Sequence, residues 1–143
     1  VCSSDLALGI HQLDRVDENW ERRHEIWNRY QRAFADLPVE TPSPVPENQR
    51  HAFHLYTLLI DEDRTGVTRN EFLDKLQAEN IGSGVHYMSI PEHRYYQNTY
   101  DWEPDDYPHA KRIGRKTASL PLAPNLTEGD VDDVITAVRK VVG

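Results

Sequence analysis

Hydrogen-bond donors gather in one short segment, Gly84–His93, whose sequence is GVHYMSIPEH. His86, Tyr87 and His93 bracket a loop that follows a short predicted strand, a position where functional groups often collect. Imidazole and phenol groups are natural donors to a phosphorylated or hydroxylated ligand. The segment therefore predicts a binding loop built on these three side chains. A buried His–Tyr corner closed by a hydrogen bond is the alternative.

The other potentially reactive side chains do not form a recognisable catalytic or metal-binding motif. His51 and His54 are three residues apart on a predicted strand, so their side chains point to opposite faces and cannot chelate one metal. The sequence holds no Walker or dinucleotide phosphate loop, no Gly-x-Ser-x-Gly and no His-Glu-x-x-His. Its one cysteine excludes a disulfide framework and a Cys-rich zinc site.

The lysines all fall on, or at the end of, predicted amphipathic helices, where a surface role is expected. They are Lys75, Lys111, Lys116 and Lys140. We therefore predict no catalytic residue, no cofactor-binding residue and no metal ligand in this chain.

A long amphipathic helix is predicted over residues 7–37, because apolar residues recur there at helical spacing. About 30 residues at a rise of 1.5 Å make a helix roughly 45 Å long, more than a small domain covers. We therefore expect one end to pack against something outside this chain; a lone helical arm or coiled-coil stub is the alternative. Residues 38–50 contain four prolines and predict an extended linker.

Residues 51–143 are predicted to form a small α/β domain. Three strands alternate with three helices, which indicates a thin three-stranded sheet with helices packed on it. Such a sheet is more typical of an appendage to a larger body than of a free enzyme. The strands are expected at 51–60, 85–88 and 117–122, and the helices after Thr68, from Asp106 to Arg115 and after Thr127.

Length, composition and charge argue against membrane and nucleic-acid partners. The chain has 143 residues, about one domain, and no apolar run near the roughly 20 residues that span a bilayer, so no membrane partner is expected. A formal net charge of -8 repels phosphate backbones and disfavours nucleic acid. These features favour a cytoplasmic protein. Residues 1–6 lack an initiator Met and resemble a translated sequencing adapter, so we expect a non-native tail.

Several short motifs occur in a particular order along the chain. They are ALGIHQL at 7–13, Arg22-Arg23 with Tyr30 on one helix, GVHY at 84–87, Pro91-x-His93, and SLPL at 119–122 followed by Leu126-Thr127 and Asp130-Val131. Together they resemble the DegT/StrS family of sugar aminotransferases. The resemblance covers the chain after Leu6 and matches the C-terminal third of that family.

The resemblance implies the small C-terminal domain of a fold-type-I enzyme that uses pyridoxal 5'-phosphate, with residues 7–37 as an inter-domain helix. It implies a homodimer whose cofactor is bound by an N-terminal domain outside this chain. No lysine here has the Ser-x-x-Lys context of the family, so no Schiff-base lysine is carried over.

The implied substrates are a nucleotide-linked keto sugar and an amino-acid donor, expected to be glutamate. His86, Tyr87 and His93 become candidate substrate contacts, and the chain alone is expected to be inactive. Two alternatives stay open: a standalone binding or regulatory module with the same fold, and a fragment of a relative that uses the same cofactor to dehydrate sugars.

Overall fold

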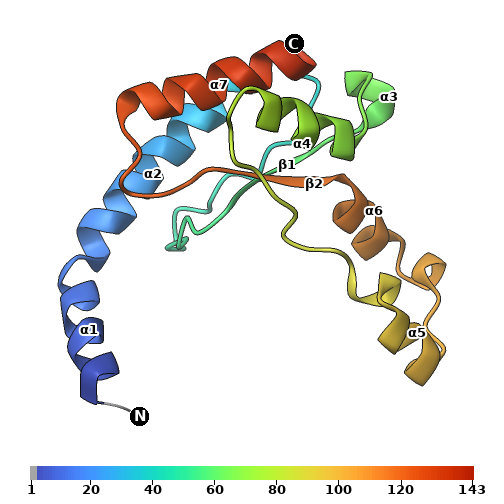
Figure 1. The fold of residues 1–143 in the computed structure, drawn as a ribbon, viewed down its shortest axis with the longest axis horizontal. Coiled ribbons are helices and arrows are strands. Elements are labelled where there is room, and N and C mark those ends of the chain that lie inside the picture. The colour runs from blue at the N-terminus through green and yellow to red at the C-terminus, as the bar shows by residue number, and fades with distance from the viewer. Residues whose placement is uncertain (1–2) are drawn as a thin grey trace.

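The chain, described over residues 3–143 by a computed structural model, consists mainly of helices arranged around a small sheet (Figure 1). Side chains are described from residue 7 onward. In chain order the elements are α1 (Ser3–Asp14), α2 (Val16–Ala33), β1 (Tyr56–Leu59), α3 (Glu62–Thr65), α4 (Arg69–Ala78), the 3-10 turn η1 (Ile90–Glu92), α5 (Arg94–Tyr100), the 3-10 turn η2 (Pro104–Asp106), α6 (Pro108–Lys116), β2 (Thr117–Leu120) and α7 (Glu128–Val142).

The sheet has two strands, so the prediction of three is wrong. β1 and β2 are antiparallel, with Tyr56 opposite Leu120. Single bridges flank the pair: Glu40 joins β1 at Leu59, and Gly84 joins β2 at Ser119. Residues 85–88, expected as the third strand, contribute no strand, because the chain leaves the sheet directly after Gly84.

The first predicted strand is shorter than expected because its first half makes a local turn. Phe53 adopts a positive φ of 46°, and its backbone N–H donates to Nδ1 of His51 at 3.0 Å. This conformation is incompatible with an extended strand. Strand β1 therefore begins only at Tyr56.

The expected single helix over residues 7–37 is two helices. At Arg15 the backbone N–H donates to the carbonyl of Gln12, three residues back, at 3.3 Å, and the regular helical bonding is interrupted there. The apolar stripe also divides. Leu8 and Leu13 on α1 are 66% and 72% exposed, whereas Trp27 and Tyr30 on α2 are buried.

The core lies between the sheet and helices α2, α4 and α7, which Figure 1 shows gathered on one side of the strands. Trp27 of α2 meets Tyr56 of β1 edge-to-face, with ring centroids 4.8 Å apart. Tyr30 is fully buried and donates its hydroxyl to the carbonyl of Pro121 at 3.0 Å. Burial of its phenol raises the pKa of Tyr30. Phe72 and Leu76 of α4 and Val131, Val134 and Val138 of α7 complete the core.

The predicted helix starts are largely confirmed. Thr68 accepts from the N–H of Glu71 and closes a capping box at α4, and Thr127 does the same with Asp130 at α7. Helix α6 begins with Pro108, as expected, but Tyr107 rather than Asp106 precedes it, because Asp106 ends the turn η2.

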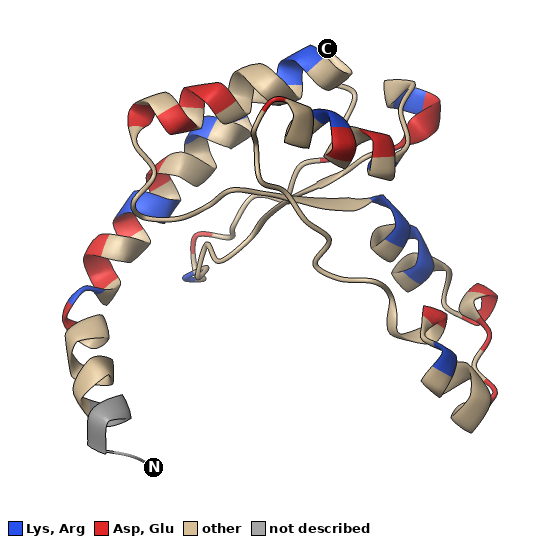
Figure 2. Cartoon of the chain, viewed as in Figure 1, with Lys and Arg blue, Asp and Glu red and all other residues tan. Residues whose placement is uncertain are grey.

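Charged residues lie on the helices and loops, while the two strands carry none (Figure 2). Arg22 and Arg29 of α2 form ion pairs with Glu128 and Asp132 of α7, at 2.6 Å for Arg22–Glu128 and 2.5 Å for Arg29–Asp132. No helix within residues 3–143 is both long enough and apolar enough to cross a membrane.

Candidate functional site

The three predicted binding residues share one segment, but only two of their rings meet. The rings of His86 and Tyr87 lie edge-to-face, with centroids 4.9 Å apart, and the peptide bond that joins the two residues is cis. Tyr87 is 72% exposed and His86 is half-buried. His93 is exposed at the start of α5, where its ring lies 6.5 Å from that of Tyr96. Among the described residues, no ring contact joins His93 to the other two.

One nitrogen of the His86 ring faces inward. Nδ1 is buried and has no hydrogen-bond partner among the residues that the structure describes. The ring covers Gly84, since a Cβ built on Gly84 would lie 3.4 Å from Cε1 of His86. Because Nδ1 is covered, Nε2 is the nitrogen that a ligand can reach. His86 and Tyr87 therefore offer an imidazole Nε2 and an exposed phenol, both capable of binding a polar ligand.

A close approach by helix α6 fixes the base of this loop. A Cβ built on Gly114 would lie 2.6 Å from the backbone nitrogen of Ser89 and 3.0 Å from its Cβ. Any larger residue at position 114 would push the loop away from the helix. Both Gly114 and Ser89 are buried. A glycine inside a predicted helix is the sequence signal that could have revealed this contact.

Polar bonds reinforce the same attachment. The hydroxyl of Ser89 donates to Oε2 of Glu92 at 2.6 Å, and Nε of Arg115 on α6 donates to Oε1 of Glu92 at 2.7 Å. The Ser89 hydroxyl, aided by Arg115, lowers the pKa of the Glu92 carboxyl, although partial burial opposes the shift. Glu92 is therefore a carboxylate at neutral pH and ties the turn η1 to α6.

Beyond His93 the chain carries an aromatic cluster that sequence reasoning missed. The rings of Tyr96 and Trp102 stack with centroids 5.5 Å apart. Tyr100 and Tyr107 pack against Trp102, and Tyr95 packs edge-to-face on Tyr96. These contacts hold α5 and η2 together, although Tyr95 and Tyr100 remain 64% and 54% exposed.

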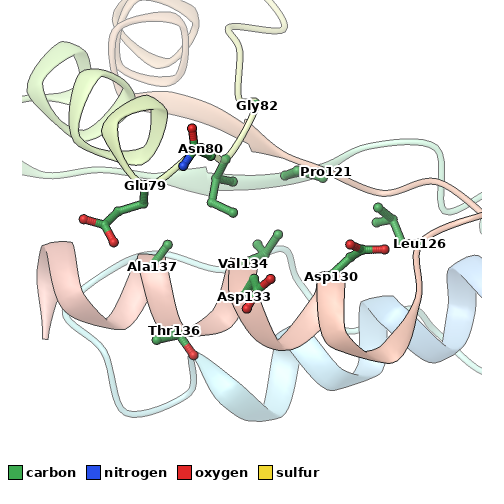
Figure 3. A pocket seen from close by; sticks show the side chains of 11 residues that line it. Glu79, Asn80, Gly82, Pro121, Leu126, Asp130, Asp133, Val134, Thr136 and Ala137 are labelled. Carbon is green, nitrogen blue, oxygen red and sulfur yellow. The ribbon is translucent and has the colours of Figure 1, made fainter.

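A hollow of about 560 Å³ lies elsewhere, between the end of α4 and helix α7, and contains none of the three predicted residues (Figure 3). Glu79, Asp130 and Asp133 give it an acidic lining. The carboxylate of Glu79 accepts from Nζ of Lys140 at 2.7 Å, and that of Asp130 closes the cap of α7. Hydrogen bonds from Thr127 lower the pKa of Asp130. Two of the three acids thus already serve the fold.

Within the described part of the chain, no group of three or more His, Cys, Asp or Glu side chains is arranged to hold a metal ion. His51 and His54 are both exposed. The ring of His51 packs against Trp27 instead, with centroids 5.0 Å apart.

The sequence of the chain matches a known family of enzymes. The sequence model of the DegT/DnrJ/EryC1/StrS aminotransferase family matches residues 4–139. The chain belongs to this family. Among curated relatives of the family, the spore coat polysaccharide biosynthesis protein SpsC of Bacillus subtilis is 46% identical over 137 residues. That alignment covers 95% of this chain and 35% of SpsC, so the chain spans about a third of its relative.

Solved structures in this aminotransferase family have the same fold. Spr1654 of Streptococcus pneumoniae, described as a candidate sugar aminotransferase, superposes in its apo form with a TM-score of 0.85 at 29% identity, over 94% of this chain and 33% of Spr1654. PseC of Helicobacter pylori, an aminotransferase involved in the biosynthesis of pseudoaminic acid, gives 0.85 at 26% identity, over 95% of this chain and 36% of PseC.

The family implies pyridoxal phosphate, and the lysines of this chain do not fit that cofactor. A Schiff base needs a lysine amine facing a cofactor cavity. Lys75 is exposed on α4. The other three are held as ammonium partners of carboxylates: Lys111 with Asp105, Lys116 with Asp61 and Lys140 with Glu79. As held here, these four lysines do not offer a Schiff-base amine.

Proposed function

We propose that this chain is the C-terminal part of an aminotransferase that moves an amino group from an amino acid to a nucleotide-linked keto sugar. The family match over residues 4–139 carries the proposal. SpsC is named for spore coat polysaccharide biosynthesis, and PseC is described as an aminotransferase involved in the biosynthesis of pseudoaminic acid. Glutamate is the proposed donor: it leaves as 2-oxoglutarate while the sugar ketone becomes an amine.

Pyridoxal phosphate is the proposed cofactor of the longer protein, and the structures of Spr1654 in its PLP and PMP forms support it. Because one lysine of this chain is exposed and the other three are ion-paired, we propose that a part of the longer protein outside this chain binds the cofactor. We propose that residues 51–143 form one wall of the site, reached through the helical segment 7–37 and the linker 38–50. A homodimer in the cytoplasm, and inactivity of this chain alone, belong to the same proposal.

The proposed role of the loop is to hold the sugar substrate. Tyr87 presents its phenol to solvent, His93 is exposed, and Nε2 of His86 is the reachable ring nitrogen. A nucleotide sugar carries diphosphate and hydroxyl oxygens, and these groups can donate hydrogen bonds to such oxygens. Because the chain carries a net charge of -8, local donors rather than its overall field must hold an anionic substrate.

Half-reaction kinetics test this assignment. In the protein encoded by the complete reading frame that contains this chain, we expect Tyr87→Phe or His86→Ala to raise KM for the keto-sugar nucleotide about 10-fold or more, the loss of one or two hydrogen bonds. KM for glutamate should stay unchanged. Ile90→Ala, an exposed neighbour on the same loop, is the matched control.

Two results would contradict the proposal. Equal effects of Tyr87→Phe on both half-reactions would remove the loop from sugar binding. Failure of the complete protein to aminate any keto-sugar nucleotide with any amino-acid donor would reject the aminotransferase activity itself, whereas failure with glutamate alone would reject only that donor. Loss of a hydroxyl from the sugar without amine transfer would instead identify the dehydratase alternative.

A further inference from the structure

Two buried polar atoms without partners belong to residues at or near one backbone bridge. Within the described residues, Nδ1 of His86 and Oγ of Ser119 are both buried and accept or donate no hydrogen bond; Nε of Arg23, on α2, is the third such atom. Ser119 is only 4% exposed. Buried polar side-chain atoms in folded proteins nearly always have a partner, so such atoms call for an explanation.

Gly84 and Ser119 form the bridge that brings these two atoms together. The N–H of Gly84 donates to the carbonyl of Ser119 at 3.2 Å, and the N–H of Ser119 donates to that of Gly84 at 2.8 Å. Residues that exchange both bonds in an antiparallel pair stand directly opposite, and their side chains lie on the same face about 4.5–5.5 Å apart. Gly84 has no side chain, so this face is open above it.

The ring of His86 occupies that open face. A Cβ on Gly84 would lie 3.4 Å from Cε1 and 3.9 Å from Nδ1 of His86. The side chain of Ser119 extends from the same face one bridge position away. The Ser119 side chain and the buried ring nitrogen of His86 therefore lie on the same face beneath the loop.

The surroundings leave few other partners for the Ser119 hydroxyl. Neighbours on its own strand, Ala118 and Leu120, are apolar and point to the opposite face. Thr57 stands opposite Ser119 on β1 and is half-buried. It is the competing partner, although the structure contains no hydrogen bond between the side chains of Thr57 and Ser119.

We propose that Ser119 is a positioning residue for His86. Its hydroxyl donates to Nδ1, either after rotation about the Cα–Cβ bond or through one bridging water. An imidazole that accepts at Nδ1 carries its proton on Nε2, so the bond fixes both the tautomer and the ring orientation. His86 then faces the outside as a hydrogen-bond donor. The link to sugar binding rests on the proposed function, whereas the Ser119–His86 unit stands on the geometry alone.

NMR of the labelled 143-residue chain tests the unit without any substrate. In the unmodified chain, a direct bond should slow the exchange of the Ser119 hydroxyl proton enough for it to be observed and should give a nuclear Overhauser effect to Hε1 of His86, whereas a bridging water should fix the tautomer without this effect. Two-bond ¹H–¹⁵N spectra should show neutral His86 almost wholly as the Nε2–H tautomer. In Ser119→Ala the ratio of the two tautomers should fall severalfold, and the Nδ1 resonance should move toward that of a nitrogen accepting no bond.

Thr57→Val is the matched control, because it removes the neighbouring hydroxyl from the same face and leaves Ser119 in place. It should leave the His86 spectrum unchanged. The proposal is overturned if Thr57→Val shifts the tautomer ratio and Ser119→Ala does not, or if the unmodified chain shows His86 as a free mixture of tautomers. In an active longer protein, Ser119→Ala should raise KM for the sugar and leave KM for the donor unchanged. If only this kinetic experiment fails, the role in sugar binding is rejected, but the bond between Ser119 and His86 is not.

Discussion

The body and the arm of this molecule are held together by different forces. The body comprises α2, β1, α4, β2 and α7, and its core is built of fully buried aromatic and aliphatic side chains. The arm, residues 85–107, contains only two buried residues, Ser89 and Pro91. It is attached to α6 by one close backbone approach at Gly114, by bonds through Glu92 and by the ion pair of Asp105 with Lys111, while stacked aromatic rings hold its own segments together.

This difference shows how the binding loop is positioned. The body gains stability from burial, which is non-directional and tolerates small displacements. The arm relies on short, specific contacts with α6, so its attachment is fixed while the side chains of Tyr87 and Tyr95 stay exposed to meet a ligand or another surface. Substitutions should therefore act on the two regions in different ways.

The largest effect is expected in the body. Leu58 is fully buried on β1, so Leu58→Ala leaves a cavity and should lower the free energy of unfolding by about 2–5 kcal/mol in urea titrations followed by tryptophan fluorescence. Ile90→Ala in the arm, where the side chain is 54% exposed, should change it by less than about 0.5 kcal/mol. Similar losses for both variants would mean that the arm is packed as tightly as the body.

A smaller effect, local to the arm, is expected at Gly114. The added methyl of Gly114→Ala meets the backbone of Ser89, so it should cost about 1–3 kcal/mol and shift the amide resonances of residues 85–93. Gly129→Ala is the matched helical control, since its Cβ would meet only Oγ1 of Thr127, at 3.7 Å; it should be neutral or stabilising by up to about 1 kcal/mol. Unmoved loop resonances in Gly114→Ala would show that the close approach does not hold the loop.

The smallest effect concerns pH. The pKa of Glu92 in the folded chain lies below its ordinary value of 4.5, so its contribution is complete above pH 4.5 and is lost as pH falls through the lowered pKa. The amide of Ser89 and the Nε–H of Arg115 should therefore titrate below pH 4.5 and not between pH 5 and 7. In Glu92→Gln this step should disappear. A step of equal size in the variant would assign it to other carboxylates.

Sequence patterns predicted the body well because its determinants are local. Both capping boxes, at Thr68 and Thr127, rest on residues three positions apart, and both are present. The helical spacing of the valines in α7 likewise predicted its buried face. Strand β2 was found at its expected start, Thr117.

The errors arose where an irregular turn or a contact between distant residues decides the conformation. The positive φ of Phe53 shortens β1, and the contact of Gly114 with Ser89 accompanies the departure of residues 85–88 from the sheet. Neither the turn at Phe53 nor this contact can be predicted from the spacing of apolar residues in the sequence. For the candidate site, the sequence indicated the chemistry of His86, Tyr87 and His93, but the residues beneath them could not be recognised before the chain was folded. In the sequence, Ser119 stands out only as part of the SLPL motif.

Helix α1 extends away from the body beyond α2 (Figure 1), with Leu8, Ile10 and Leu13 exposed on it. It spans 12 residues, and an isolated helix of that length is marginal in water. Its backbone amides should therefore exchange with deuterium through local fraying, far faster than those of buried α2. Slow amide exchange in α1 would therefore indicate that another protein surface covers this helix. The exchange rate of α1 can thus report whether the molecule has assembled with a partner.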